Sequence, residues 1–188
     1  FFRSASFATN LALKIVMGFM AIYFMVIFIA AGVGVFFLLK EEFHLEPLAT
    51  VNKYLIYYLV GDLVIRYFLQ KMPVMNIRPL LTLPIKRNTI VHFSLGKTAI
   101  SFFNLLHAFF FIPFSIMLIL NDHAVVSVIL WHLGVFSIIY MNNFINILLN
   151  NKDSVFYSVL AVVVGCGVAQ YYKVFDVTTY TAPFFEGL

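Results

Sequence analysis

Two ionisable residues four positions apart are the most chemically distinctive feature of this sequence. Asp62 and Arg66 lie within residues 51–70, a segment that is otherwise largely apolar. Residues four apart share one face of a helix, so we expect the two side chains to pair. Ionisable groups inside a membrane span are costly unless they are paired or face water. Two interpretations follow: a substrate path or gating contact, or a structural salt bridge from which Arg66 reaches the lipid headgroups.

A second polar pattern consists of asparagines. Asn142, Asn146 and Asn150 recur every four residues, and Asn143 lies beside them. On a helix this spacing predicts a polar stripe along the cytoplasmic half. Asparagine side chains in lipid need hydrogen-bond partners, so the stripe should face protein or water. It is explained either by packing between helices or by a translocation lining or subunit interface.

The sequence contains no recognisable catalytic motif. There is no HExxH, GxSxG or P-loop lysine motif, and Cys166 is the single cysteine. His107 and His132 lie within apolar segments, and neither has a carboxylate or second histidine three or four residues away. We expect them to be interhelical hydrogen bonders, and we expect no catalytic residue, metal ligand or cofactor site in the chain. An intramembrane enzyme that uses Asp62 or His107 is the remaining alternative.

The amino-acid composition indicates what kind of structural elements hold these residues in place. The chain has 188 residues, of which 11% are charged and 63% hydrophobic, with 23 phenylalanines. An ordinary soluble domain is about 25% charged, and one of this size buries only about 70% of its unfolded surface. These values exclude a soluble globular protein and a disordered chain, and one cysteine excludes a disulfide scaffold. The sequence predicts an all-α, polytopic transmembrane helical bundle.

Hydropathy predicts five spans in a single transmembrane domain over residues 1–188. Their expected ranges are 11–39, 51–70, 93–120, 124–149 and 154–172. Gly32 and Gly34 are expected to loosen the end of the first span, and Pro113 to kink or break the third. Residues 173–188 are too polar to span, and we expect a loop before a sixth helix in a longer protein.

The positions of the cations orient the chain. With a cytoplasmic N-terminus, three cations fall outside, at Lys40, Lys53 and Lys173. The other nine fall inside: Arg3, Lys14, Arg66, Lys71, Arg78, Lys86, Arg87, Lys97 and Lys152. An excess of Lys and Arg on the cytoplasmic side is the usual arrangement, so we predict that the N-terminus is cytoplasmic.

The connection over residues 71–92 is rich in proline and positive charge. Pro84 suits the first turn of a short helix. In such a helix Ile85 can face the membrane or a partner, while Lys86 and Arg87 face anionic headgroups or an acidic surface. The alternative is a basic interfacial loop with no partner.

This connection resembles the cytoplasmic loop of ABC-2-type transporter permeases. The similarity rests on Leu81-Thr82-Leu83-Pro84-Ile85-Lys86-Arg87 and on Gly96-Lys97 at the entry to the next span. Over nearly its whole length the chain is also similar to a group of bacterial ABC-2-like membrane proteins, in which Phe1-Phe2-Arg3-Ser4 precedes the first span. It departs from the family pattern in lacking a sixth span.

The resemblance implies a bacterial cytoplasmic (inner) membrane permease that belongs to an exporter. Its partners would be a separate ABC ATP-binding subunit carrying ATP-Mg and a second permease half or copy, within the lipid bilayer and without nucleic acid. A short coupling helix would dock on the ATPase through Arg78, Leu81, Pro84, Ile85, Lys86 and Arg87. Asp62, Arg66, Asn142 and Asn146 would set the position of the spans that rock during transport. A structural or assembly subunit without transport activity would show the same sequence features.

Overall fold

The structure, a computed structural model, is helical throughout the part of the chain that it describes. It describes residues 5–70, 84, 86, 88–90, 92–93, 96, 101–149 and 152–188, with side chains from residue 11 onward. The elements are α1 (Ala5–Phe37), the π-helical turn η1 (Leu38–Glu42), α2 (Pro47–Leu69), α5 (Phe102–Leu120), α6 (Val125–Leu149), α7 (Asp153–Tyr171) and α8 (Val177–Glu186). These ranges contain no strand, which confirms the all-α prediction.

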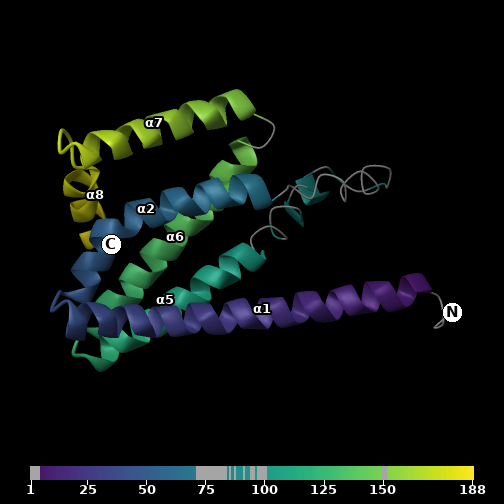
Figure 1. Cartoon of the computed structure of the whole chain (residues 1–188), viewed down its shortest axis with the longest axis horizontal. Helices are drawn as coiled ribbons and strands as arrows, with labels where there is room; N and C mark the ends of the chain where they lie inside the picture. Colours follow the sequence, from purple (N-terminus) through teal and green to yellow (C-terminus); the bar gives the residue numbers. More distant parts are fainter. Residues whose placement is uncertain are drawn as a thin grey trace.

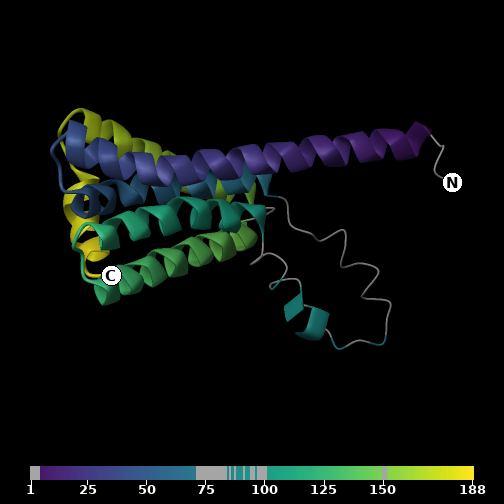
Figure 2. The same ribbon diagram turned by 90° about the horizontal axis from the view of Figure 1, so that it is seen from below.

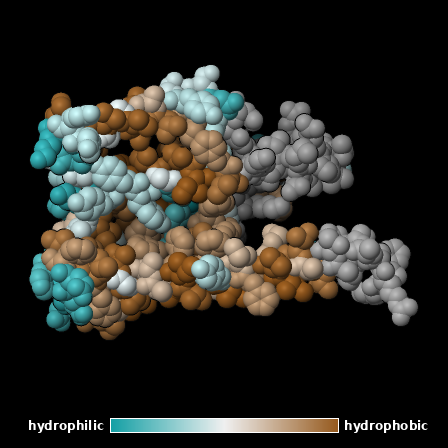
Figure 3. Space-filling view, in the orientation of Figure 1, coloured by the Kyte–Doolittle hydropathy of each residue, from teal (hydrophilic) through white to brown (hydrophobic). Residues whose placement is uncertain are grey.

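Five of these helices are long and apolar enough to cross a membrane, as the sequence predicts. The α1–α2, α5–α6 and α7–α8 connections gather at one end of the bundle, and the end of α6 and the beginning of α7 lie at the other end (Figures 1 and 2). In Figure 3 hydrophilic residues collect at the first of these ends, while hydrophobic residues cover much of the helix sides. The chain is therefore a multi-pass membrane protein, and its orientation stays a prediction.

Several span boundaries differ from the predicted ones. The first helix begins at Ala5, and helical structure continues through η1 to Glu42. The third long helix begins at Phe102 rather than at residue 93, because the Ser101 side chain accepts a hydrogen bond from the Asn104 backbone N–H and caps the helix. The prediction that Pro113 breaks this span is wrong, since α5 continues through this residue to Leu120, and the kink stays a prediction.

The half of the bundle nearest the α1–α2 connection holds the apolar core. Buried side chains of α1, α2, α5 and α6 meet there, including Phe36, Leu55, Phe114 and Trp131. Trp131 donates a hydrogen bond from Nε1 to Asn52 Oδ1 at 2.7 Å, so the one polar atom of the indole is satisfied. This packing leaves the opposite half of α2, α5 and α6 for the polar residues.

Gly32 is a packing position rather than a point where α1 loosens. It is buried within the continuous helix α1, and a Cβ atom at this position would clash with the Phe110 backbone oxygen of α5. Small residues in membrane helices allow such close backbone approach. The α1–α5 pairing is the most extensive between helices. The expected loosening is therefore wrong for Gly32, and Gly34 also lies inside the helix.

The prediction of a loop over residues 173–188 is also wrong for most of this range. Residues Val177–Glu186 form α8, which packs on α2 and buries Phe185 in the core. Asp176 starts this helix: its Oδ1 accepts hydrogen bonds from the Thr178 backbone N–H at 2.9 Å and from Thr178 Oγ1 at 2.7 Å. Periodicity over ten residues is too short a signal to separate such a helix from a polar loop.

We predict that the docking of α8 weakens in acid through Asp176. The hydrogen bond from the Thr178 hydroxyl, helped by the Thr178 backbone N–H, holds the pKa of Asp176 below its ordinary value. A lowered pKa in the folded state means that the carboxylate stabilises α8 above the unfolded pKa, and that this contribution is lost as pH falls through the folded pKa. A spin label at Tyr180→Cys, in a Cys166→Ser background, should become more mobile between pH 6 and pH 3. Asp176→Asn keeps a good capping residue and should remove this part of the pH dependence.

Candidate functional site

One face of α2 carries a polar stripe with a spacing of four residues. Its members are Tyr58, Asp62, Arg66 and Gln70. Asp62 is 7% exposed and Arg66 is fully buried, so the stripe faces the interior of the bundle rather than lipid. Buried charges are tolerated only when they are paired and hydrogen-bonded. The partners on α2, α5 and α6 therefore define the site.

Asp62 and Arg66 form the predicted ion pair. Arg66 Nε lies 2.8 Å from Asp62 Oδ1 and 2.7 Å from Oδ2. The expected extension of Arg66 to the headgroups is wrong, because its guanidinium lies inside the protein. Its Nη1 donates to Gln70 Oε1 at 3.0 Å and to Asn143 Oδ1 at 3.3 Å, and the group also lies over the Phe103 ring, 5.9 Å from the centroid.

His107 of α5 joins this pair from a position 45 residues farther along the chain. Its Nε2 lies 2.9 Å from Asp62 Oδ1, and its Nδ1 is hydrogen-bonded to the Tyr58 hydroxyl. The carboxylate can only accept, so Nε2 carries a proton; when the ring is neutral, Nδ1 accepts from the Tyr58 hydroxyl. His107 is thus the interhelical hydrogen bonder that the sequence predicts. His132 is another, since its Nδ1 lies 2.8 Å from Ser115 Oγ of α5.

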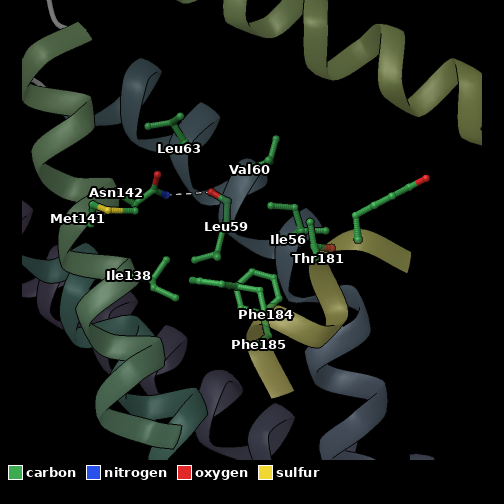
Figure 4. Close-up of a pocket in the computed structure, with 11 residues that line it drawn as sticks. Ile56, Leu59, Val60, Leu63, Ile138, Met141, Asn142, Thr181, Phe184 and Phe185 are labelled. Atoms are coloured by element: carbon green, nitrogen blue, oxygen red, sulfur yellow. Dashed lines mark hydrogen bonds between the residues drawn. The ribbon is translucent and has the colours of Figure 1, made fainter. Parts of the chain in front are cut away.

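The asparagines of α6 complete the site from a third helix. Asn142 Nδ2 donates to Asp62 Oδ2 at 2.7 Å. It also donates to the Leu59 backbone oxygen at 2.8 Å, as Figure 4 shows. Asn146 Nδ2 lies 3.5 Å from the Arg66 backbone oxygen. The predicted stripe therefore faces protein over this part of α6. Asn150 lies outside the described residues.

Together these contacts form one polar network, defined by Tyr58, Asp62, Arg66, Gln70, His107, Asn142, Asn143 and Asn146. It joins α2, α5 and α6 in the half of the bundle that faces away from the apolar core. Asp62 and Arg66 cancel each other's charge, so the network is neutral when His107 is neutral. Chemically, Asp62 orients the imidazole and would stabilise a proton on it, the arrangement of a general base with its orienting carboxylate.

Two apolar cavities border this network. One, about 360 Å³, lies between α2, α6 and α8, and Asn142 lines it together with Ile138 and Phe184 (Figure 4). The other, about 270 Å³, lies between α1, α2 and α5, and its lining includes Asp62 and His107. Within the described ranges no group of three histidine, cysteine, aspartate or glutamate residues could hold a metal ion.

Four of the six residues of the predicted coupling contact lie outside the described residues. The other two are exposed: Pro84 lies in a bend and Lys86 has no regular secondary structure. Lys86 accepts a hydrogen bond on its backbone oxygen from the Thr89 backbone N–H at 3.0 Å. Arg78, Leu81, Ile85 and Arg87 lie outside the described residues. The end of α2 that carries Gln70 and the beginning of α5 both lie at the end of the bundle opposite the α1–α2 connection (Figure 1).

Sequence reasoning missed Tyr58 and Gln70, and it gave Asn143 no partner. A signal was available for the first two, because Tyr58, Asp62, Arg66 and Gln70 recur every four residues and must share one helical face. The contact between Asp62 and His107 had no such signal. No carboxylate lies three or four residues from His107 on its own helix, and the one that contacts it, Asp62, comes from α2.

The fold and the site together define a multi-pass helical membrane protein with a buried ionic network. The chain belongs to the family of unknown function DUF5687, whose model matches residues 1–188. No curated protein and no solved structure matches the chain.

Proposed function

We propose that the chain is the membrane-spanning permease subunit of an ABC-2-type exporter in the bacterial cytoplasmic membrane. A separate ATP-binding subunit would dock on the cytoplasmic side, carry ATP-Mg and hydrolyse it. The observation that supports this proposal best is the basic, proline-rich connection between α2 and α5, with Pro84, Lys86 and Arg87, in a chain with five apolar helices. Catalysis would belong to the partner and not to this chain.

The position of the polar network supports a coupling role for this connection. The network includes Arg66 in the last turn of α2 and Gln70 at its C-cap, directly before the connection. Gln70 Nε2 donates to Asn143 Oδ1 of α6 at 2.8 Å, and Asp62 contacts His107 of α5. A force on the connection would therefore act on three spans through paired polar groups rather than on one helix alone. Asp62, Arg66, Asn142 and Asn146 would keep these spans in register as they rock.

Gentle extraction of the full-length protein tests the partnership directly. The proposal expects an ATP-binding subunit to co-purify with it, and a second copy or half of the permease to be present. Repeated extraction in several mild detergents and in nanodiscs without any ATP-binding subunit would reject the transporter function.

The coupling contact makes a narrower prediction. Lys86→Glu with Arg87→Glu reverses two cations at the proposed interface, and like charges brought together at an interface cost several kcal/mol. ATPase binding should therefore weaken by about tenfold or more. Binding isotherms with the purified ATP-binding subunit would measure this. Lys152→Glu, in the α6–α7 connection at the same end of the bundle, is the control and should bind normally. Unchanged binding by the double variant would reject the coupling role of Lys86 and Arg87, and it would leave the proposed exporter function untouched.

A structural or assembly subunit without transport is a second candidate, and the pairing within the network favours it. Asp62 accepts from Arg66, His107 and Asn142, which is the arrangement that a static bundle needs. Proteoliposomes that contain the permease and its ATP-binding partner separate the two functions. Stimulated ATP hydrolysis and substrate movement support the exporter, and their absence in a stable complex supports the assembly subunit.

A further inference from the structure

Two connections of the bundle meet at the end where hydrophilic residues collect. They are the α1–α2 connection, residues 38–46, and the α5–α6 connection, residues 121–124 (Figures 1 and 2). Lys40 Nζ donates to Asn121 Oδ1 at 2.6 Å, and His123 Nε2 lies 3.6 Å from Glu46 Oε1. Each connection therefore contributes two side chains to the contact between them.

A polar cavity of about 500 Å³ lies between these two connections. The four contacting side chains line it, together with His44 of the α1–α2 connection. Phe36 and Pro47 also line it and are buried, so packed helix ends form part of its wall. The two polar contacts join the connections across this cavity, and their strength therefore affects how far apart the connections lie.

The carboxylate of the second contact is fixed in place, whereas the imidazole is free to change. Both Glu46 oxygens accept hydrogen bonds from backbone N–H groups at the start of α2, from Leu48 at 3.1 Å and from Ala49. The His123 backbone N–H donates to the Leu118 oxygen at 3.2 Å, but the ring itself stays 3.6 Å from the carboxylate. The His123 side chain is 32% exposed, so it exchanges protons directly with water.

Only one of the two contacts contains a side chain that titrates near neutral pH. The amide of Asn121 carries no charge, and a lysine ammonium keeps its proton throughout the range from pH 5 to pH 8. Imidazole is the side chain that changes its charge in this range. An imidazolium always carries a proton on Nε2, so it donates to Glu46 and attracts it as an opposite charge. The contact at His123 therefore strengthens as pH falls and weakens as pH rises.

The other ionisable groups of the two connections act on the imidazole in opposite directions. Lys40 and His44 line the same cavity and repel a positive charge at His123. The remaining groups are acids and attract it: Glu41, Glu42 and Asp122. His44 is the other imidazole of the cavity wall, so it serves as the internal control for any effect of pH.

We propose that His123 and Glu46 form a clasp between the two connections that acid strengthens. As pH falls from 8 to 5.5, the imidazolium donates to the carboxylate and draws the connections together across the cavity. The contact between Lys40 and Asn121 keeps them in register at every pH in this range. Exposed ion pairs are weak, so the population of the closed form should rise about 1.5- to fivefold. The clasp does not depend on the proposed exporter function, since this chain supplies both partners.

A pair of spin labels on the two connections tests the clasp in nanodiscs, without any ATPase partner. Phe43 and Val125 are exposed, and Phe43→Cys with Val125→Cys in a Cys166→Ser background carries the labels. Dipolar EPR spectroscopy then measures the distance between the labels at pH 8 and at pH 5.5. The shorter distance should gain population at pH 5.5 by about 1.5- to fivefold. Equal distance distributions at the two pH values overturn the proposal.

Three variants of the labelled protein assign the effect of pH to this pair. His123→Gln removes the titrating group, and Glu46→Gln removes the negative charge while its side-chain oxygen still accepts from the start of α2. Each should abolish the change between pH 8 and pH 5.5. His44→Gln is the matched control and should keep it, because His44 makes no contact with Glu46. A pH response that persists in His123→Gln, or that disappears in His44→Gln, overturns the assignment.

Discussion

Replacing Arg66 with methionine should lower the free energy of unfolding by roughly 3–5 kcal/mol, the range found when one partner of a buried ion pair is removed. Methionine fills much of the same space, so the loss comes from charge rather than from an empty cavity. Asp62 would remain buried with His107 and Asn142 as partners but without its counter-ion. Arg66 is fully buried, so water cannot take over its role.

Thermal unfolding in detergent, followed by the loss of the monodisperse protein, measures this effect. For a chain of this length the midpoint should fall on the order of 10 °C. The double variant Asp62→Asn with Arg66→Met leaves no orphan charge and should recover most of the loss. Lys152→Met, an exposed cation at the end of the bundle, is the control and should change little. If the single and double variants were equally unstable, the ion pair would not be the source of the effect.

The second large effect is expected at Gly32, where α1 packs directly against the backbone of α5. Gly32→Ala places a Cβ atom against the Phe110 backbone oxygen, and a backbone atom cannot rotate away as a side chain can. Overpacking of this kind typically costs about 1–3 kcal/mol. The α1–α5 pairing is the largest in the bundle, so the variant should show a lower unfolding temperature and a wider separation of the two helices.

Gly34 provides the matched control two residues away on the same helix. A Cβ atom at Gly34 meets nothing within 4 Å, and alanine favours a helix over glycine by about 1 kcal/mol. Gly34→Ala should therefore be neutral or stabilising in the same thermal assay, and spin-label distances between α1 and α5 should not change. A Gly32→Ala protein as stable as the Gly34→Ala protein would show that the helices separate at little cost.

The sequence alone determined the class of protein and the local pairings. A charged fraction of 11% and long apolar runs require helices that satisfy their own backbone in lipid, so the five spans could be predicted. The pairing of Asp62 with Arg66 follows from a spacing of four residues on one helix. The orientation of the Asn142 and Asn146 stripe toward protein follows from the cost of leaving an amide without partners in lipid. These inferences need only the helical repeat and the fact that lipid offers no hydrogen-bond partners to polar groups.

Only the tertiary structure decided which helices meet. Asp62 and His107 come together although 45 residues separate them, because α2 and α5 present these faces to each other. The same holds for Gly32 against Phe110 and for α8 on α2. A helical repeat fixes which side chains share a face, but the choice of neighbour depends on how small residues and polar groups of different helices fit together. The packing of α2 against α5 and α6 joins polar residues from separate helices into one network, and it leaves the cavities that border this network.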